Sequence, residues 1–528
     1  MLSLSDFTTP ILIVTVSYGA CILAVRVYHR LFPPLRFLRG PANSNLLFGN
    51  FRELADDPTA SLHEKWAAEY GSAYRMHGIL NSSVLVLQDA KGMHHLLSHT
   101  EDIYQRPESA RWNLSRLLGS GVLVTEGEKH RMQRRVMNPA FGPIQVRALT
   151  DIFVDKSLEL RDYWLKEIQS SDSKTPVIVG AGLSKMTLDV IGLAGFNYEF
   201  KALTSDGDEL SRAFSSIFGG NQRNFLDLLR IQFAFLRKLP IPANPRIRHA
   251  REIMDRIGKQ LVTDAKKLAE LPEEKDTKSR DLLTLLVRSN MNTSIPEHQR
   301  MKDEDVLARH ETTSTSTSWA IWVLTQHKDV QAKLREELLT VATDNPSMEE
   351  LNALPYLDSF VREVLRMCAP IMWVFRTAIK DDVMPLKDPI VDVNGKMHTE
   401  LHIRKGQQIK LSILAMNKDK KVWGDDAAEF KPERWGKEPE AAHNIPGVWS
   451  HLMTFIGGPR ACIGWRFSVV EMKALLFTLV RAFEFDLAVP KEEIIFKKGV
   501  MAPLARPAAK NLPGHQLPVV LTPVKKDN

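Results

Sequence analysis

The sequence has few cysteines, and their scarcity excludes several kinds of site. Its 528 residues include only three, Cys21, Cys368 and Cys462. So small and odd a set argues against a disulfide framework and places the folded part in a reducing compartment. Three scattered thiols also cannot form a four-thiolate zinc or iron–sulfur site. A cysteine that takes part in chemistry here must therefore act alone.

The chain also lacks internal repeats, a glycine-rich nucleotide fingerprint and a strong excess of one charge. The formal net charge of +7 is modest for the length and gives no nucleic-acid signature. An anionic membrane surface or an acidic protein partner fits this charge, and we expect no nucleic-acid partner. Without a nucleotide fingerprint, a fused reductase is not expected either.

Long alternating strand patterns are scarce, and helical periodicity dominates. Strand-like stretches are short and few, whereas apolar residues recur at helical spacing in several long segments. We therefore expect one large, mainly helical domain with small β-sheets over residues 46–528. The expected helices cover residues 151–168, 245–270, 328–342, 356–367 and 464–483, and the expected strands cover 83–87, 408–413 and 519–524.

The N-terminus carries the one long apolar run. Residues 10–25 read PILIVTVSYGACILAV, and basic residues cluster after this run rather than before it. We expect residues 1–30 to be a membrane anchor that leaves the downstream chain cytosolic. A cleaved signal peptide and a buried core helix are the alternatives. Residues 31–45, rich in proline and glycine, then form a connector.

The most informative segment is Phe455 to Gly464, which reads FIGGPRACIG. Its glycines and proline exclude a helix and allow close approach of the backbone to a flat object. Because a helical pattern follows, Cys462 lies at a helix start, where free amides and the helix dipole favour a thiolate. Such a thiolate suits an axial ligand to a metal macrocycle, and Arg460 can pair with an acidic rim group of the cofactor. A buried structural cysteine is the alternative.

This segment resembles the haem-binding loop of cytochromes P-450, F-x-x-G-x-R-x-C-x-G, with every fixed position filled. The resemblance, to the microsomal fungal-like type, implies the cytochrome P-450 fold and a single haem-binding domain. It implies haem b, iron protoporphyrin IX, with Cys462 as the axial metal ligand. Phe455 and Arg460 are then cofactor-binding residues.

Further segments match the same family in the same order. Glu363 and Arg366, at helical spacing, followed by Arg434 in the string FKPERW, resemble the structural Glu/Arg/Arg network of these enzymes. A solvated surface pair is the alternative for an isolated E-x-x-R. His130 and Arg134 lie one helical turn apart where the family has W-x-x-x-R, and the resemblance implies contact with a haem propionate.

The resemblance also implies a role for Arg376, which matches a second haem-propionate partner of the family. The basic run of Lys129, Arg131, Arg134 and Arg135 could form part of a docking face for an acidic electron donor.

The string ETTSTSTSW resembles the distal helix of the family, in which an acid and a threonine deliver protons during oxygen activation. By position Glu311 is the acid and Thr312 the hydroxyl. The segment before it departs from the family: Arg309 stands at a glycine position, and about eight residues of apolar helix are missing, which would shorten a helix by ~12 Å. We therefore hypothesise a damaged distal site, as a true variant or through a misjudged splice boundary.

The leading interpretation is a haem-thiolate monooxygenase at the endoplasmic reticulum membrane. It would insert one atom of O2 into a small apolar organic substrate, with electrons from NADPH–cytochrome reductase or a cytochrome b-type donor. Lipid, terpenoid and xenobiotic substrates all remain open. The alternatives are a haem-binding protein with impaired or no monooxygenase activity, and a haem-free membrane-tethered interaction protein.

Overall fold

The computed structural model describes most of the chain between residues 35 and 524. The described ranges are 35–57, 61–119, 121–170, 175–205, 209–218, 230, 234–238, 245–270, 281–291, 311–496, 503–505 and 517–524. Two compact units emerge, one formed by residues 1–105 and 373–415, the other by residues 106–372 and 416–528. The predicted membrane anchor, residues 1–30, lies outside the described residues.

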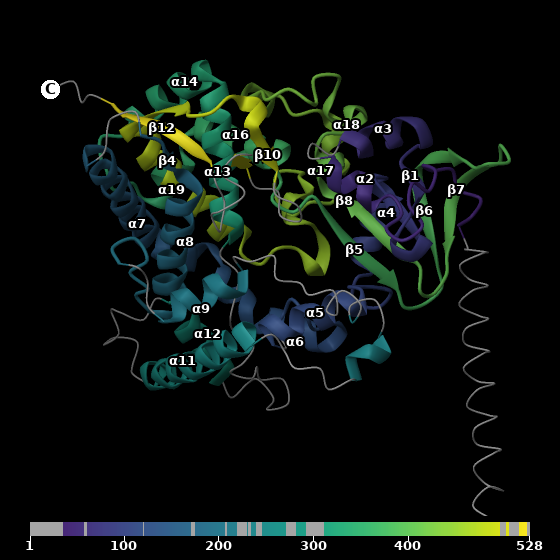
Figure 1. Ribbon diagram of the computed structural model, residues 1–528, viewed down its shortest axis with the longest axis horizontal. Coiled ribbons are helices and arrows are strands. Elements are labelled where there is room, and N and C mark those ends of the chain that lie inside the picture. The colour runs from purple at the N-terminus through teal and green to yellow at the C-terminus, as the bar shows by residue number, and fades with distance from the viewer. Residues whose placement is uncertain are drawn as a thin grey trace, which may run out of the picture. The chain divides into compact units, whose positions relative to one another are not determined.

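The first unit is built on a five-stranded sheet of order β1-β2-β8-β5-β3. Strands β2 and β8 pair in parallel and the other neighbours pair antiparallel, so segments far apart in sequence lie side by side (Figure 1). A separate hairpin joins β6 and β7. The elements of this unit are α2 (Phe51–Asp56), α3 (Ser61–Tyr70), β1 (Ala73–His77), η1 (Ile79–Asn81), β2 (Ser83–Leu87), α4 (Ala90–Ser98), β3 (Tyr104–Gln105), β5 (Trp373–Ala378), β6 (Asp382–Val391), β7 (Met397–Ile403) and β8 (Gln408–Ser412).

Buried apolar side chains at every second position of β1 and β2 form the core of this unit. Tyr74 and Met76 on β1 and Val84 and Val86 on β2 are fully buried and pack together with Trp66 of α3. Residues two apart on a strand share a face, so each strand contributes two side chains to one apolar cluster. This burial fixes the register of the two strands.

The second unit is mainly helical, with two small sheets of order β4-β12-β9 and β10-β11. Its N-terminal elements are α5 (Glu108–Leu118), α6 (Gly127–Met137), η2 (Asn138–Phe141), α7 (Pro143–Ser170), β4 (Val177–Ile178), α8 (Val179–Phe196), α9 (Glu209–Phe218), η3 (Ala234–Lys238), α11 (Pro245–Ala269), α12 (Leu282–Met291) and α13 (Glu311–Gln326). Further along lie α14 (Lys328–Leu339), α15 (Met348–Asn352), α16 (Pro355–Met367), α18 (Lys420–Trp423), η7 (Pro432–Gly436), η8 (Glu440–Asn444), η9 (Met453–Phe455), η10 (Gly458–Arg460), α19 (Trp465–Ala482), β9 (Phe483–Leu487), η11 (Lys491–Glu493), β10 (Ile494–Phe496), β11 (Pro503–Ala505) and β12 (Pro518–Pro523). Helix α17 (Ile413–Asn417) spans the boundary between the units.

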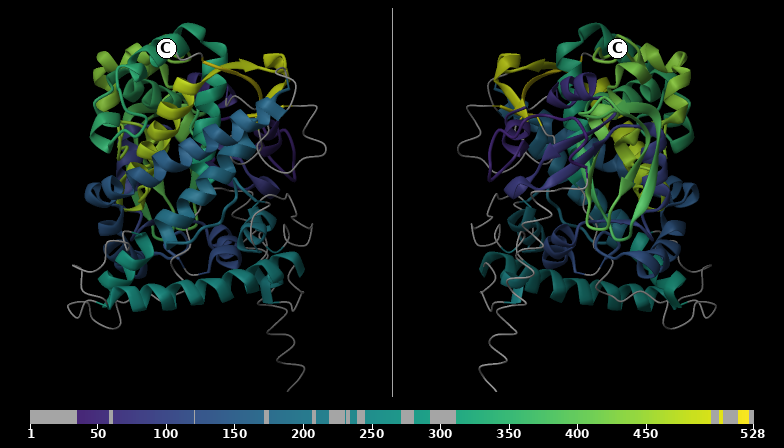
Figure 2. Two further views of the ribbon diagram at one scale, coloured as in Figure 1. Left: turned by 90° about the vertical axis from the view of Figure 1, so that its left-hand side faces the viewer. Right: turned by 90° about the vertical axis from the view of Figure 1, so that its right-hand side faces the viewer.

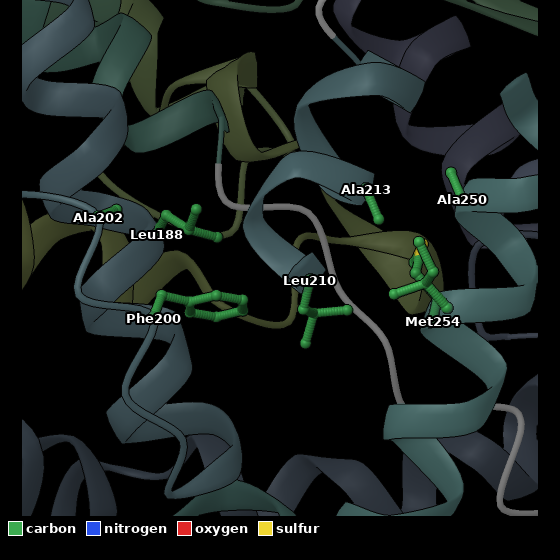
Figure 3. Packing of buried hydrophobic residues seen from close by; sticks show 8 residues of the cluster. Leu188, Phe200, Ala202, Leu210, Ala213, Ala250 and Met254 are labelled. Atoms are coloured by element: carbon green, nitrogen blue, oxygen red, sulfur yellow. The ribbon is translucent and has the colours of Figure 1, made fainter. Parts of the chain in front are cut away.

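Helices α8, α9 and α11 share an apolar core. Figure 3 shows Phe200 pointing toward Leu210 of α9, with Leu188 of α8 beside them, and Ala250 and Met254 of α11 complete the cluster. Helix α11 runs as one long helix (Figure 2). Its apolar residues recur every three to four positions, which places them on the one face that the cluster buries.

Helix α8 is the one helix among the described residues that is long and apolar enough to span a membrane. Two thirds of it is buried within the protein, and it packs against α7, α12 and α13. A core helix accounts for this composition, so α8 carries no evidence for a membrane span.

The mainly helical architecture with small sheets confirms the sequence-based fold class. The predicted helices correspond to α7, α11, α14, α16 and α19, and the three predicted strands to β2, β8 and β12. Strands that the sequence did not predict also form, among them β1, β5, β6 and β7. The Lys/Glu/Asp-rich stretch 269–280 is predicted from its composition to be a solvated loop; α11 ends at its first residue, Ala269, and residues 271–280 lie outside the described residues.

Candidate functional site

Two backbone hydrogen bonds close the loop that contains Cys462. The N–H of Cys462 donates to the carbonyl oxygen of Phe455 at 2.9 Å, and the N–H of Val448 donates to that of Ile456 at 2.9 Å. Helix α19 begins directly after its N-cap residue, Gly464. The sequence-based placement of Cys462 just before a helix is therefore confirmed.

Glycine is required at position 457 because another backbone segment passes over it. A Cβ atom there would lie 1.6 Å from the carbonyl oxygen of Pro446, far inside any possible contact. Ile456 and Gly458, on either side, adopt positive φ angles of 57° and 70°. The absence of a side chain at Gly457 therefore lets the backbone at Pro446 pack against the cysteine loop. This contact supports the loop.

The thiol of Cys462 is accessible although protein groups surround it. Cys462 is exposed, whereas Cys368 is buried. Burial nevertheless raises the pKa of the Cys462 thiol, while the N–H of Gly464 and the charge of Arg134 lower it to a smaller extent. The amide at the helix start therefore acts in the expected direction, toward the thiolate, but burial of the thiol outweighs it. A bound metal ion would deprotonate a coordinating thiol outright, against the effect of burial.

Positive charge and one neutral imidazole gather beside this loop. His130 is buried in α6, and burial lowers its pKa to about 3. The charges of Arg460, Arg134 and Arg106 act in the same direction. Arg134, one turn further along α6, donates from Nη1 to the carbonyl oxygen of Ala461 at 3.0 Å. A neutral imidazole can donate one N–H, so the accessible thiol and this cationic set fit an iron porphyrin with acidic side groups.

Arg460 pairs with a protein carboxylate in this structure. Its Nη2 donates to Glu126 and to the carbonyl oxygen of Thr125 at 2.7 Å, and the ion pair is almost fully buried. Glu126 also accepts from the backbone N–H of Arg106 at 3.1 Å. Sequence reasoning missed Glu126 and Arg106, which belong to none of the motifs. That Arg460 contacts a cofactor group stays a prediction.

The structure brings Glu363, Arg366 and Arg434 together. Arg366 and Glu363 are both fully buried and form two parallel hydrogen bonds of 2.8 and 2.9 Å. Nε of Arg434 lies 3.5 Å from Glu363, and its Nη1 donates to Asp426 at 2.7 Å. The bond from Arg434 is the main reason that the pKa of Asp426 falls to about 2. Trp435 also donates to Glu363 at 3.0 Å, so the buried carboxylate is fully compensated.

Asn417 links this network to the cysteine loop. Nη1 of Arg366 donates to the carbonyl oxygen of Asn417 at 3.0 Å. The Asn417 side chain accepts from the N–H of Met453 at 2.9 Å and donates to Thr454 at 2.8 Å. Thr454 in turn donates to the carbonyl oxygen of Leu365 at 2.7 Å. The buried ion pair thereby positions the residues that lead into the loop.

The hydroxyl-rich run forms helix α13, so a Ser/Thr-rich linker is excluded there. Its buried hydroxyls bond back to carbonyl groups one turn earlier, as Ser316 does to Thr312 at 3.1 Å and Thr317 does to Thr313 at 3.0 Å. Thr312 is half-buried on this helix. Nothing is described of the Glu311 side chain or of the segment 292–310, so Arg309 and the predicted shortening lie outside the described residues.

Polar side chains connect α13 to α19, the helix that follows Cys462. Thr313 donates to Ser468 at 3.2 Å and hydrogen-bonds to the buried carboxyl of Glu471. Burial raises the pKa of Glu471 to about 8, although the hydrogen bond with Thr313 lowers it to a smaller extent. Glu471 is therefore protonated at neutral pH. The sequence offered no signal for this group except its place in an apolar helical pattern.

Arg376 is the one predicted site residue that belongs to the first unit. It is buried on β5, and its Nη1 donates to the carbonyl oxygen of Phe375 at 2.9 Å. Its predicted contact with a propionate remains an expectation.

Comparisons with known proteins agree with this site. Residues 39–508 match the family described as Cytochrome P-450. The chain is 48% identical to Cytochrome P-450 monooxygenase 205 of Postia placenta, over 97% of this chain and 98% of that protein. It is 48% identical to Cytochrome P-450 monooxygenase 128 of the same fungus, over 92% of each chain. Cytochrome P-450 monooxygenase claO of Ampulloclitocybe clavipes is 35% identical over 91% of this chain and 92% of that protein. The first match spans 537 positions, more than the 528 residues of this chain, so that relative has residues where this chain has none.

Proposed function

The chain belongs to the cytochrome P-450 family and is a monooxygenase, and from this premise we propose that it inserts one oxygen atom from O2 into a small apolar organic substrate. The observation that supports the proposal is the exposed Cys462 in its closed loop, with Arg134 of α6 bonded to Ala461 of the same loop. The family implies a haem held by a cysteine thiolate. We propose haem b, with Cys462 as its axial ligand.

The chain's own residues would hold this cofactor from several sides. Phe455 and the backbone around Gly457 would form the floor beside the sulfur, and Arg134 would face the acidic side groups with His130 as a neutral donor. Arg460 and Arg376 are proposed as further partners of those groups. When bound, the haem supplies the iron at which O2 is reduced and one oxygen atom is transferred.

Thr312 and Glu311 are proposed to hold and deliver protons during oxygen reduction. Thr312 lies at the start of α13, and the bond of the neighbouring Thr313 to Ser468 fixes that helix against α19. A hydroxyl beside a carboxyl can pass a proton inward from solvent. We propose a structural part for Glu363, Arg366 and Arg434, because the Glu363–Arg366 pair is fully buried and Arg366 also bonds to the backbone at Asn417 and Ala427.

Electrons are proposed to come from NADPH–cytochrome reductase, with a cytochrome b-type protein as a second donor. On α6, Lys129, Arg131 and Arg135 are exposed, while Arg134 turns toward Ala461. Exposed basic side chains on the helix whose Arg134 bonds to the cysteine loop fit an acidic donor that must approach the cofactor.

We further propose that residues 1–30 anchor the chain in the endoplasmic reticulum membrane as a single span, that 31–45 connect it, and that 46–528 form the cytosolic catalytic domain. The apolar run and the basic residues after it support this arrangement. Deleting residues 1–30 should move the protein from the membrane fraction to the soluble fraction, and retention in the membrane would contradict the anchor.

The activity test uses the full chain with its reductase in lipid vesicles. Apolar compounds that shift the haem spectrum on binding are then supplied with NADPH, and product is measured against NADPH consumed. Thr312→Ala should lower the product formed per NADPH, whereas Thr340→Ala, at an exposed position of α14's C-cap, should not. NADPH consumption without any product in the wild type would favour the alternative with impaired activity, which the names of the relatives do not favour.

A further inference from the structure

A second cluster of metal-binding side chains lies on the surface, apart from the cysteine. One ligand atom each of Glu438, His443 and His451 lies within 4.8 Å of the other two. The two imidazole rings are 4.6 Å apart between centroids and tilted by 42°. Two imidazoles and one carboxylate form a common ligand set for zinc and similar divalent ions.

The spacing is close to what such an ion requires. Bonds of about 2.0–2.1 Å to a tetrahedral zinc ion put its donor atoms roughly 3.3 Å apart. The present separations allow this geometry after small side-chain rotations, because His443 is exposed and His451 is half-buried. A water molecule would then complete the four-coordinate site.

The surrounding bonds suit a ligand role for the carboxylate. Nη1 of Arg362 lies 3.1 Å from Oε1 of Glu438, which leaves the second oxygen for an ion. Arg362 also pairs with Asp358 at 2.7 Å, so its charge is already shared. Carboxylate ligands in metal sites are typically held by such an outer hydrogen bond. Within the described ranges, no side-chain hydrogen bond occupies the ring nitrogens of His443 or His451.

The chain between the two histidines bends back on itself. Ser450 and His451 have φ angles of 49° and 52°, an unusual pair of left-handed residues without glycine. They form the tight turn between Trp449 and Leu452, which are joined as an isolated bridge. This turn directs His451 toward His443 on η8.

We propose that Glu438, His443 and His451 bind a divalent transition-metal ion, for which zinc is the best fit, and that the ion braces the turn before the cysteine loop. The ring of Trp449 in this turn packs at 5.7 Å from Phe455 and at 6.5 Å from Trp465, on either side of Cys462. An ion that fixes the turn would therefore stiffen the loop from outside. This proposal is independent of the proposed oxidation reaction.

The test measures zinc affinity of the haem-loaded, tag-free full chain by competition with a chromophoric chelator. One zinc ion should bind per chain, and magnesium should not compete. His443→Asn with His451→Asn should weaken binding by at least about thirtyfold, and Glu438→Gln by about tenfold. His402→Asn, an exposed histidine beside Glu400 in the other unit, is the matched control and should leave the affinity unchanged.

X-ray absorption at the zinc edge distinguishes this site from others. The 1:1 complex should show two imidazole ligands, and the double variant, checked for an unaltered haem spectrum, should lose them. Equal zinc affinity in the wild type and the double variant, or a zinc spectrum without imidazole, would overturn the proposal. If the double variant does not fold, the zinc affinity of His443→Asn decides instead, because a change at this exposed position should not disturb folding.

Discussion

Arg366 and Asn417 are joined by a hydrogen bond of 3.0 Å from the guanidinium to the backbone carbonyl. Through it a fully buried ion pair fixes the one residue whose side chain bonds to both Met453 and Thr454. The cysteine loop is thus held from two directions, by the Glu363–Arg366 network through Asn417 and by the passage of Pro446 over Gly457.

Asn417→Ala should loosen the loop without removing the ion pair. The N–H of Met453 would lose its partner, at a cost of about 1–3 kcal/mol, and Thr454 would lose the donor from Asn417 while keeping its bond to Leu365. We expect faster loss of haem on dilution but unchanged secondary structure, as measured by haem transfer to an acceptor protein. Asn394→Ala, at an exposed turn, is the control. Haem loss at the wild-type rate in Asn417→Ala would contradict the link.

Arg366→Leu should have a more severe effect. Glu363 would remain buried without its bidentate partner, and breaking a buried pair costs about 3–5 kcal/mol. Protein made with this change should contain little or no haem, measured as haem absorbance per protein, rather than turn over substrate slowly. Exposed Arg131→Leu should incorporate haem normally. A haem-loaded Arg366→Leu protein with low activity would show a catalytic role instead.

Stability should depend on pH through Glu471. Its folded pKa of about 8 exceeds its unfolded value of 4.5, so its favourable contribution is complete below about pH 4.5 and is lost as the pH rises through about 8. The free energy of unfolding of the wild type should therefore fall from about pH 5 to about pH 9 relative to that of Glu471→Gln. Denaturant unfolding at several pH values measures this difference. Parallel pH profiles of the two proteins would exclude an abnormal Glu471.

Charge reversal on α6 tests the docking face. Lys129→Glu with Arg135→Glu should raise the reductase concentration needed for half-maximal rate by roughly tenfold at low salt, and less at high salt. The haem spectrum should not change, because these side chains are exposed. Arg404→Glu with Lys405→Glu, exposed in the other unit, controls for net charge. An equal effect of both pairs would place the donor elsewhere.

Local motifs were predictable from the sequence because neighbouring residues carry them. The cysteine loop, the Glu363–Arg366 spacing and helix α13 each depend on a short stretch of chain, and the structure confirms their placement. Asn417, Glu126 and Glu471 were not predictable, because their importance arises from contacts with segments distant in sequence. The burial that raises the pKa of Cys462, against the smaller effects of the Gly464 amide and Arg134, has the same origin.

The missed strands have a local explanation. Pro385 and Pro389 interrupt the pattern of β6, and proline argues against a strand in sequence-based reasoning. The structure accommodates them in a two-stranded hairpin whose register shifts between Pro385 and Ile390. In a two-stranded hairpin, one edge of each strand makes no hydrogen bonds to another strand. A proline, which has no backbone N–H, costs little stability at such an edge.

The most direct test of the account is the carbon monoxide spectrum of the reduced protein with Cys368 and Cys462 changed in turn. Wild type and Cys368→Ser should give the red-shifted Soret band of a thiolate-bound haem. Cys462→Ser should lose that band, with or without loss of the haem itself. A Cys462→Ser protein that takes up haem and keeps the wild-type carbonyl spectrum would contradict the assignment of Cys462 as the axial ligand.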